Sequence, residues 1–205
     1  CVNEDSEKAM IRAKKTLAFY VSVGKIYREF LATNGFEESE LTSPLEAMKK
    51  EGFQVDIVSE KKGTIKAWAE TDWGDTYEAD KALADVSESD YHALVLPGGL
   101  FNPDELRLNE DALSFVKAFF QAGKPVAAIC HAPWILINAG VVEGRKMTSV
   151  PSVAQDLRNA GVNWVDEPVV VDSGLVTSRT PKDLDAFNSK LLEELQEGRH
   201  SGQHA

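Results

Sequence analysis

The segment Ala127-Ala-Ile-Cys-His-Ala-Pro-Trp134 runs from an apolar strand into the start of a helix. The apolar run stops at Cys130, and Pro133 can occupy the first turn of the helix that follows. Ala128 and Ala132 flank the cysteine and are small enough for the tight turn of a nucleophile elbow, which presents its nucleophile at the edge of a sheet. The neighbouring helix N-terminus would favour a thiolate there. A buried cysteine packed as a small hydrophobic residue is the ordinary alternative.

A second turn gives this segment its context. The segment Leu94-Val-Leu-Pro-Gly-Gly-Leu100 is an apolar strand that ends in two glycines. Two glycines allow the backbone to approach a ligand and to direct N–H groups at it, as an oxyanion hole requires, although they also suit a simple turn. In a parallel sheet the two turns can lie side by side at the carboxyl edge, where open α/β sheets place their sites.

From about residue 40, short apolar runs alternate with helical patterns, which indicates an α/β fold with a mostly parallel sheet and helices on both faces. We expect strands over 53–58, 93–97 and 125–129, and a late hairpin over 169–171 and 175–177. A capping box over 43–46, with Pro44 as the first helical position, predicts a helix that ends near Gly52. Asn109 and the segment 180–183 are expected to begin two further helices.

The N-terminal region leaves the first strand open. Hydrophobicity favours 16–23, whereas position favours 26–33, which leads directly into 34–40. We expect an extension or extra element over 1–25, one domain over 26–197 and a tail over 198–205.

Composition narrows the class of protein. The chain has 205 residues, 43% of them apolar, with 22 Lys and Arg against 33 Asp and Glu, a net charge of −11. This favours a single folded domain and argues against nucleic acid as the main partner. Two cysteines cannot form a disulfide framework, which predicts a reducing, cytoplasmic location. The alternative to a cytoplasmic location is a bacterial lipoprotein anchored through Cys1. No membrane span is expected, because the longest apolar stretch, 17–23, is too short to cross a bilayer.

Five motifs, in order and with family spacing, resemble the ThiJ/PfpI superfamily, in its intracellular protease-like and protein deglycase branch. They are Glu37-Glu-Ser-Glu40, Leu96-Pro-Gly-Gly99, Ala128-Ile-Cys-His-Ala-Pro133, Thr148-Ser149 and Val176-Thr-Ser-Arg-Thr-Pro181. The resemblance implies a three-layer, flavodoxin-like fold of the class I glutamine amidotransferase type. Where the family commonly has glycine after Cys-His, this chain has Ala132, which fits if its φ is negative.

The resemblance also implies roles for particular residues. Cys130 matches the nucleophile, and Glu40 matches a carboxyl group that hydrogen-bonds the thiol and is protonated when the thiol is ionised. His131 matches the adjacent histidine, although chain neighbours point apart on a helix, so adjacency alone does not make it a base. Asp104, with Glu105 as its less favoured neighbour, matches an acid supplied by a second subunit, which requires a homodimer or higher homo-oligomer.

Backbone N–H groups of Gly99 and His131 are the oxyanion donors that the resemblance implies. The implied function is that of a cofactor-independent cysteine hydrolase acting on methylglyoxal, glyoxal or their protein adducts in stress protection. An intracellular cysteine peptidase and a non-enzymatic redox-sensing or chaperone-like stress protein are the alternatives. A glutaminase is disfavoured, because His200 has Gly202 where an acidic partner would stand.

No cofactor is expected, because the chain has no glycine-rich phosphate loop. No metal site is expected either, because His200 and His204 lie in a polar tail without further ligands. The four tryptophans are scattered along the chain and are interpreted as packing or pocket walls, not as a stacking platform for bases.

Overall fold

The computed structural model describes residues 27–200 and 202–203. Its centre is a seven-stranded sheet with the strand order β10-β11-β7-β6-β1-β2-β5. Neighbouring strands run parallel except for the antiparallel pair β10–β11, which is the expected late hairpin. The strands are β1 (Tyr27–Leu31), β2 (Gln54–Ser59), β5 (Lys81–Ala82), β6 (Leu94–Leu96), β7 (Val126–Ile129), β10 (Val169–Asp172) and β11 (Leu175–Ser178).

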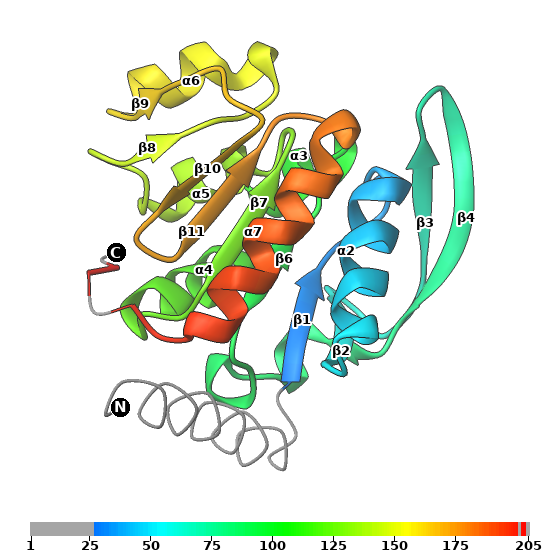
Figure 1. The fold of residues 1–205 in the computed structure, drawn as a ribbon. Coiled ribbons are helices and arrows are strands. Elements are labelled where there is room, and N and C mark those ends of the chain that lie inside the picture. The colour runs from blue at the N-terminus through cyan, green and yellow to red at the C-terminus, as the bar shows by residue number, and fades with distance from the viewer. Residues whose placement is uncertain (1–26, 201, 204–205) are drawn as a thin grey trace, which may run out of the picture.

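Helices cover both faces of this sheet, as Figure 1 shows. One face packs against α2 (Glu38–Lys50) and α7 (Leu184–Glu197). The other packs against α3 (Phe101–Leu106), α4 (Glu110–Gln121), α5 (Pro133–Ala139) and α6 (Ala154–Asn159). Side chains alternate along each strand, so β6 sends Val95 to the first core and Leu94 and Leu96 to the second. The predicted three-layer α/β sandwich is confirmed.

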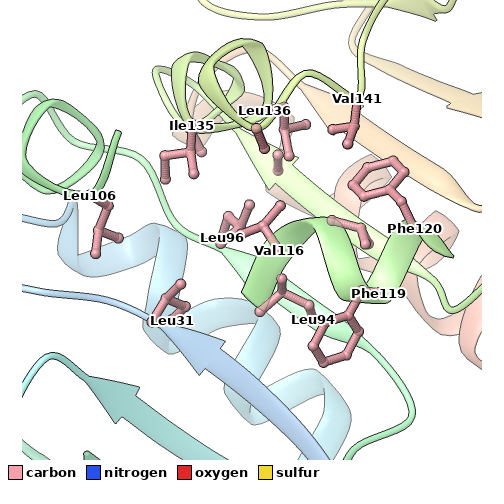
Figure 2. Close-up of a cluster of buried hydrophobic side chains, with 14 of the residues drawn as sticks. Leu31, Leu94, Leu96, Leu106, Val116, Phe119, Phe120, Ile135, Leu136 and Val141 are labelled. Carbon is pink, nitrogen blue, oxygen red and sulfur yellow. The ribbon is translucent and has the colours of Figure 1, made fainter. Parts of the chain in front are cut away.

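Figure 2 shows the second core between the sheet and α4 and α5. Phe119 and Phe120 of α4 are fully buried there, together with Val116. Asn109 caps α4 as expected, because its side chain accepts hydrogen bonds from the backbone N–H groups of Asp111 and Ala112. This core fixes β6 and β7 side by side, and the two turns that carry the candidate site follow these strands.

Smaller elements complete the fold. The antiparallel hairpin of β3 (Gly63–Ala69) and β4 (Asp72–Ala79) lies beside α2 (Figure 1). β8 (Lys146–Met147) and β9 (Asn163–Trp164) form a short parallel pair, and 3₁₀ turns occupy 83–85, 88–90, 151–153 and 181–183. No helix in the described part of the chain is long and apolar enough to cross a membrane.

The first central strand is β1, within the segment that position favoured. Phe30 and Leu31 are fully buried on opposite faces of the sheet. Glu29, mid-strand, is buried as well, and burial raises the pKa of its carboxyl group. The competing segment 16–23 and the expected extension 1–25 lie outside the described residues. Within the expected tail, the His200 backbone N–H donates to the Gly123 carbonyl at 2.7 Å.

The start of α2 corrects one expectation. The helix begins at Glu38, five residues before the capping box, and Pro44 lies inside it. Ser43 does not cap the helix, because it lies inside it, and its hydroxyl accepts a hydrogen bond from Asn188 of α7 at 2.8 Å. Packing of α2 against the sheet and α7 outweighs the local capping signal. Gly52 follows the helix with a φ of +84°, so the expected end is confirmed.

Candidate active site

Cys130 lies in a strained turn between β7 and α5. Its φ of +63° is a left-handed conformation that non-glycine residues rarely adopt. Two backbone hydrogen bonds hold it there, because its N–H donates to the Ser178 carbonyl at 3.1 Å and its carbonyl accepts from the Val150 N–H at 3.1 Å. Ala132 has a φ of −54°, so alanine fits where the family usually has glycine. The turn has the geometry of the expected nucleophile elbow.

The turn after β6 lies against this elbow. A Cβ atom at Gly98 would stand 2.8 Å from the Cys130 Cβ and 2.7 Å from the Ile129 carbonyl oxygen. Gly99 has a φ of +76°, and a Cβ there would collide with the Gly35 carbonyl oxygen. Both positions therefore require glycine, because neither has room for a side chain. The predicted approach of the Gly-Gly turn to the cysteine is present in the structure.

Glu40 reaches the same point from the first turn of α2. Its side chain is fully buried, and its Oε2 accepts a hydrogen bond from the Gly98 N–H at 2.9 Å. Its Oε1 is buried and has no hydrogen-bond partner of ordinary geometry among the described residues. Burial raises the pKa of Glu40 to about 8, although the Gly98 N–H and the Cys130 thiol act in the opposite direction. Glu40 is therefore mainly protonated at neutral pH.

The thiol of Cys130 differs from the sequence expectation. Burial raises the pKa of Cys130 well above its usual value, and negative charge on Glu40 raises it further. The predicted effect of the helix N-terminus is outweighed, because α5 has only seven residues and Cys130 is buried, at 9% exposure. Protonation of Glu40 removes the repulsion, so the pair retains a shared proton and ionises as a unit.

Two backbone N–H groups stabilise negative charge on the sulfur. Those of His131 and Gly99 both lower the pKa of the Cys130 thiol, since they stabilise negative charge on it. They come from different turns, one after β7 and one after β6. These are the same two groups that the resemblance implied as oxyanion donors.

The side chain of His131 contacts the thiol, although the two residues are neighbours in the chain. Its Nδ1 lies 3.2 Å from the Cys130 Sγ, and its Nε2 lies 3.3 Å from the Ser152 hydroxyl. The contact arises because Cys130 occupies the elbow and not a helix, so the argument that helical neighbours point apart does not apply. Burial lowers the pKa of His131, which keeps the imidazole neutral at pH 7 and able to accept a proton.

Asp104 and Glu105 lie on the exposed side of α3. Glu105 accepts a hydrogen bond from the Thr33 hydroxyl at 3.5 Å. The role of Asp104 depends on a second subunit, so it stays a prediction.

Three aromatic side chains, Trp68, Trp73 and Phe101, lie together at the β3–β4 hairpin, so two of the four tryptophans that are scattered along the chain are in contact. Trp68 and Trp73 face each other across the β3–β4 hairpin with ring centroids 5.6 Å apart, and Phe101 stacks on Trp73 at 6.2 Å. Trp73 and Phe101 are 47% and 46% exposed. The missed signal was the five-residue separation of the two tryptophans across a turn, which makes them a cross-strand pair.

One cluster offers atoms that could hold a metal. Single side-chain atoms of Glu194, Glu197 and His200 lie within 4.8 Å of one another. The His200 Nε2 is 2.9 Å from the Glu194 Oε2, so the two already form an ion pair when His200 is protonated. His204, the other histidine of the tail, lies outside the described residues.

The chain is similar to proteins whose names describe enzymes. A deglycase of Pyrococcus horikoshii is 46% identical over 166 residues, which cover 81% of this chain and 97% of the relative. Protein/nucleic acid deglycase 2 of Escherichia coli is 44% identical over 168 residues, covering 79% of this chain and 93% of the relative. Of two Bacillus subtilis relatives, one is named as a cysteine protease and the other as general stress protein 18. These names support a cysteine-dependent enzyme of the hydrolase or lyase type.

The fold comparison agrees. The structure of Drosophila melanogaster DJ-1beta superposes with a TM-score of 0.75 at 28% identity and covers 84% of this chain and 95% of that one. The family model described as the DJ-1/PfpI family matches residues 29–194, a range that contains the elbow, the glycine turn and the buried glutamate. The chain belongs to the DJ-1/PfpI family.

Proposed function

We propose that this protein is a cofactor-independent deglycase that acts through Cys130 on methylglyoxal, glyoxal or their adducts on protein side chains. One observation carries the proposal: the strained elbow holds the Cys130 thiol against both a neutral imidazole and a protonated carboxyl group. A thiol placed in this way can lose its proton to His131 and attack a carbonyl carbon. The deglycase names of the Pyrococcus and Escherichia relatives support the same class of reaction.

With methylglyoxal, the Cys130 sulfur bonds to the aldehyde carbon while the carbonyl π electrons move to oxygen. The N–H groups of Gly99 and His131 stabilise that oxygen, which takes a proton to give a hemithioacetal. Loss of the proton on the sulfur-bearing carbon gives an enediol, and reprotonation at the neighbouring carbon gives a lactoyl thioester. Water then cleaves the thioester and releases lactate and the free thiol. In this scheme His131 and Glu40 are the groups that move protons.

Replacement of Cys130 by Ala tests the proposal, with release of lactate from methylglyoxal as the measurement. The matched control is Cys1→Ala, which removes the other cysteine of the chain. We expect turnover to vanish in the first variant and to be unchanged in the second. Equal turnover by Cys130→Ala and the unmodified protein would exclude this mechanism.

Peptide hydrolysis is a second candidate, because a Bacillus subtilis relative has a cysteine-protease name. The same nucleophile would form an acyl-enzyme thioester and release an amine. Casein fluorescence assays on the same two variants distinguish the reactions. Cleavage that depends on Cys130, without lactate release, would favour the peptidase. A non-enzymatic stress protein would suppress aggregation equally well with and without Cys130.

The active form is proposed to be a homo-oligomer, at least a dimer, because the role that the resemblance implies for Asp104 requires a second subunit. A cytoplasmic location is proposed with it, since a reducing compartment keeps Cys130 as a thiol. Exposed aromatic residues beside the glycine turn could receive the apolar part of a protein substrate.

A further inference from the structure

Asn102 is a fully buried polar residue in the first turn of α3. Its side-chain Oδ1 accepts a hydrogen bond from the Thr33 backbone N–H at 2.7 Å. Its Nδ2 donates to the Pro97 carbonyl oxygen at 2.8 Å and to the Gly98 carbonyl oxygen at 3.4 Å. One amide group therefore links the segment after β1 to the two peptides that precede the oxyanion donor.

The orientation of this amide is determined by its partners. A flipped side chain would place Oδ1 against two carbonyl oxygens and Nδ2 against the Thr33 N–H group. Acceptor would then face acceptor, and donor would face donor. The Asn102 side chain can make these hydrogen bonds in one orientation only, so it fixes the two segments relative to each other. We call this arrangement a bracket.

The peptide between Gly98 and Gly99 is trans, as are all the described peptide bonds. A trans peptide group is planar, so its carbonyl and its N–H point in opposite directions. Asn102 holds the carbonyl side of this peptide. The other side is the Gly99 N–H, which stabilises negative charge on the Cys130 thiol and on the Glu40 carboxyl group. Fixing the direction of the carbonyl therefore fixes the direction of the oxyanion donor.

The preceding peptide repeats the arrangement. Asn102 holds the carbonyl oxygen of Pro97, and the N–H on the opposite side of that peptide belongs to Gly98. This N–H donates to the Oε2 of Glu40 at 2.9 Å. Asn102 thus stands behind both N–H groups that the glycine turn directs into the site.

Such a bracket is needed because two successive glycines resist peptide rotation less than any other pair of residues. A rotated Gly98–Gly99 peptide would turn a carbonyl oxygen toward the sulfur and repel the developing negative charge. We propose that Asn102 is a positioning residue that prevents this rotation and keeps the Gly99 N–H aimed at the oxyanion. This inference rests on the proposed function, since it assigns a role within the same site.

The test compares Asn102→Leu, which removes all three hydrogen bonds at similar volume, with Asn188→Leu. Asn188 is a matched control because it donates to the Ser43 hydroxyl at 2.8 Å, between α7 and α2. Two quantities are measured: kcat and KM for methylglyoxal, and the pH profile of Cys130 alkylation by iodoacetamide, followed on its peptide by mass spectrometry. We expect Asn102→Leu to lower kcat roughly 10- to 100-fold with little change in KM. Its alkylation profile should shift to higher pH, and the control should change neither.

Overlap of the Asn102→Leu and Asn188→Leu results in both measurements would overturn the inference while leaving the proposed function intact. If the unmodified protein does not turn over methylglyoxal, the proposed function is wrong. The alkylation profile would then still decide whether Asn102 positions the Gly99 N–H. If Asn102→Leu does not fold, Asn102→Asp replaces it, because a protonated carboxyl group donates a hydrogen bond and an ionised one does not. The ratio of its rate to that of the unmodified protein should decrease as the pH is raised from about 5 to about 9. A ratio that does not change with pH contradicts the inference.

Discussion

At the scale of single residues, the site depends on where protons reside. Burial raises the pKa values of both Glu40 and Cys130, so neither group is charged readily by itself. The pair becomes reactive when one proton stays on the carboxyl group while the thiol gives up its own. Neutral His131, whose Nδ1 lies 3.2 Å from the sulfur, can accept that proton.

The raised pKa of Glu40 predicts how stability varies with pH. Its pKa moves from an ordinary value of 4.5 to about 8 on folding, so the folded state prefers the protonated carboxyl group. The stability that this preference contributes is fully present below pH 4.5 and is lost as pH rises through 8. The loss should be on the order of 4 kcal/mol.

Glu40→Gln should abolish this component, because glutamine does not titrate. Urea unfolding at pH 5 and pH 8.5 measures the free energy of unfolding of both proteins, and the difference between their pH slopes isolates Glu40. Buried Glu29 and partly buried Glu194 titrate in both proteins, so their contributions cancel. Identical slopes in the two proteins would show that Glu40 is not held protonated by burial.

At the scale of elements, the site is a junction of three chain segments. The turn after β7 carries Cys130, the turn after β6 carries Gly99, and α2 carries Glu40. These segments touch without room for added atoms, because a Cβ at Gly98 would stand 2.6 Å from the Glu40 Oε2 and 2.8 Å from the Cys130 Cβ. A change in backbone position at one segment is therefore transmitted to the others.

Gly99→Ala tests this tight packing. Gly144 is a matched control, because its φ of +77° is nearly that of Gly99 and no atom lies within 4 Å of an added Cβ. We expect Gly144→Ala to lower the free energy of unfolding by about 1 kcal/mol from backbone strain alone. Gly99→Ala should cost roughly 2 kcal/mol more and abolish turnover, because the turn must move away from the backbone of residues 35–37 and the Gly99 N–H moves with it. Equal losses of stability in a urea titration of the two variants would refute the packing argument.

At the scale of the whole molecule, the sequence predicted most of the layers and the elbow. Strands β6 and β7 could be predicted because buried parallel strands are short, apolar and abruptly ended. Strand β2 could be predicted because its apolar residues alternate with polar ones. The start of α2 was missed because Pro44 is normally found in a first turn, and only packing against α7 shows that it lies in the interior. The β3–β4 hairpin was missed for a related reason, since it carries exposed polar side chains along much of its length.

The candidate site divides in the same way. Cys130 and Gly99 could be found from local patterns, because an elbow and a glycine turn have sequence signatures. The contact between His131 and the thiol could not, since it requires the positive φ of Cys130. Asn102 could not be found either: its three partners lie in two segments, one of them 69 residues away. Long-range hydrogen bonds have no local pattern in a sequence.

The assignment of Asp104 concerns the assembly and predicts complementation between inactive subunits. Asp104→Asn should fold normally, because the side chain is exposed, and should lower kcat roughly 10- to 100-fold. Glu105→Gln, its neighbour on the same exposed side of α3, is the matched control and should leave kcat nearly unchanged.

Co-refolding Asp104→Asn with Cys130→Ala then decides which subunit supplies the acid. A mixed dimer joins the intact Cys130 of one subunit to the intact Asp104 of the other, which restores one of its two sites. In an equimolar mixture, random pairing makes half of the dimers mixed. Lactate release should therefore recover to about one quarter of that of the unmodified protein if the oligomer is a dimer. An Asp104 that served its own subunit would give no recovery. Light scattering on the unmodified protein tests whether it is an oligomer. If it is a monomer at micromolar concentration, Asp104 has no second subunit whose site it could complete.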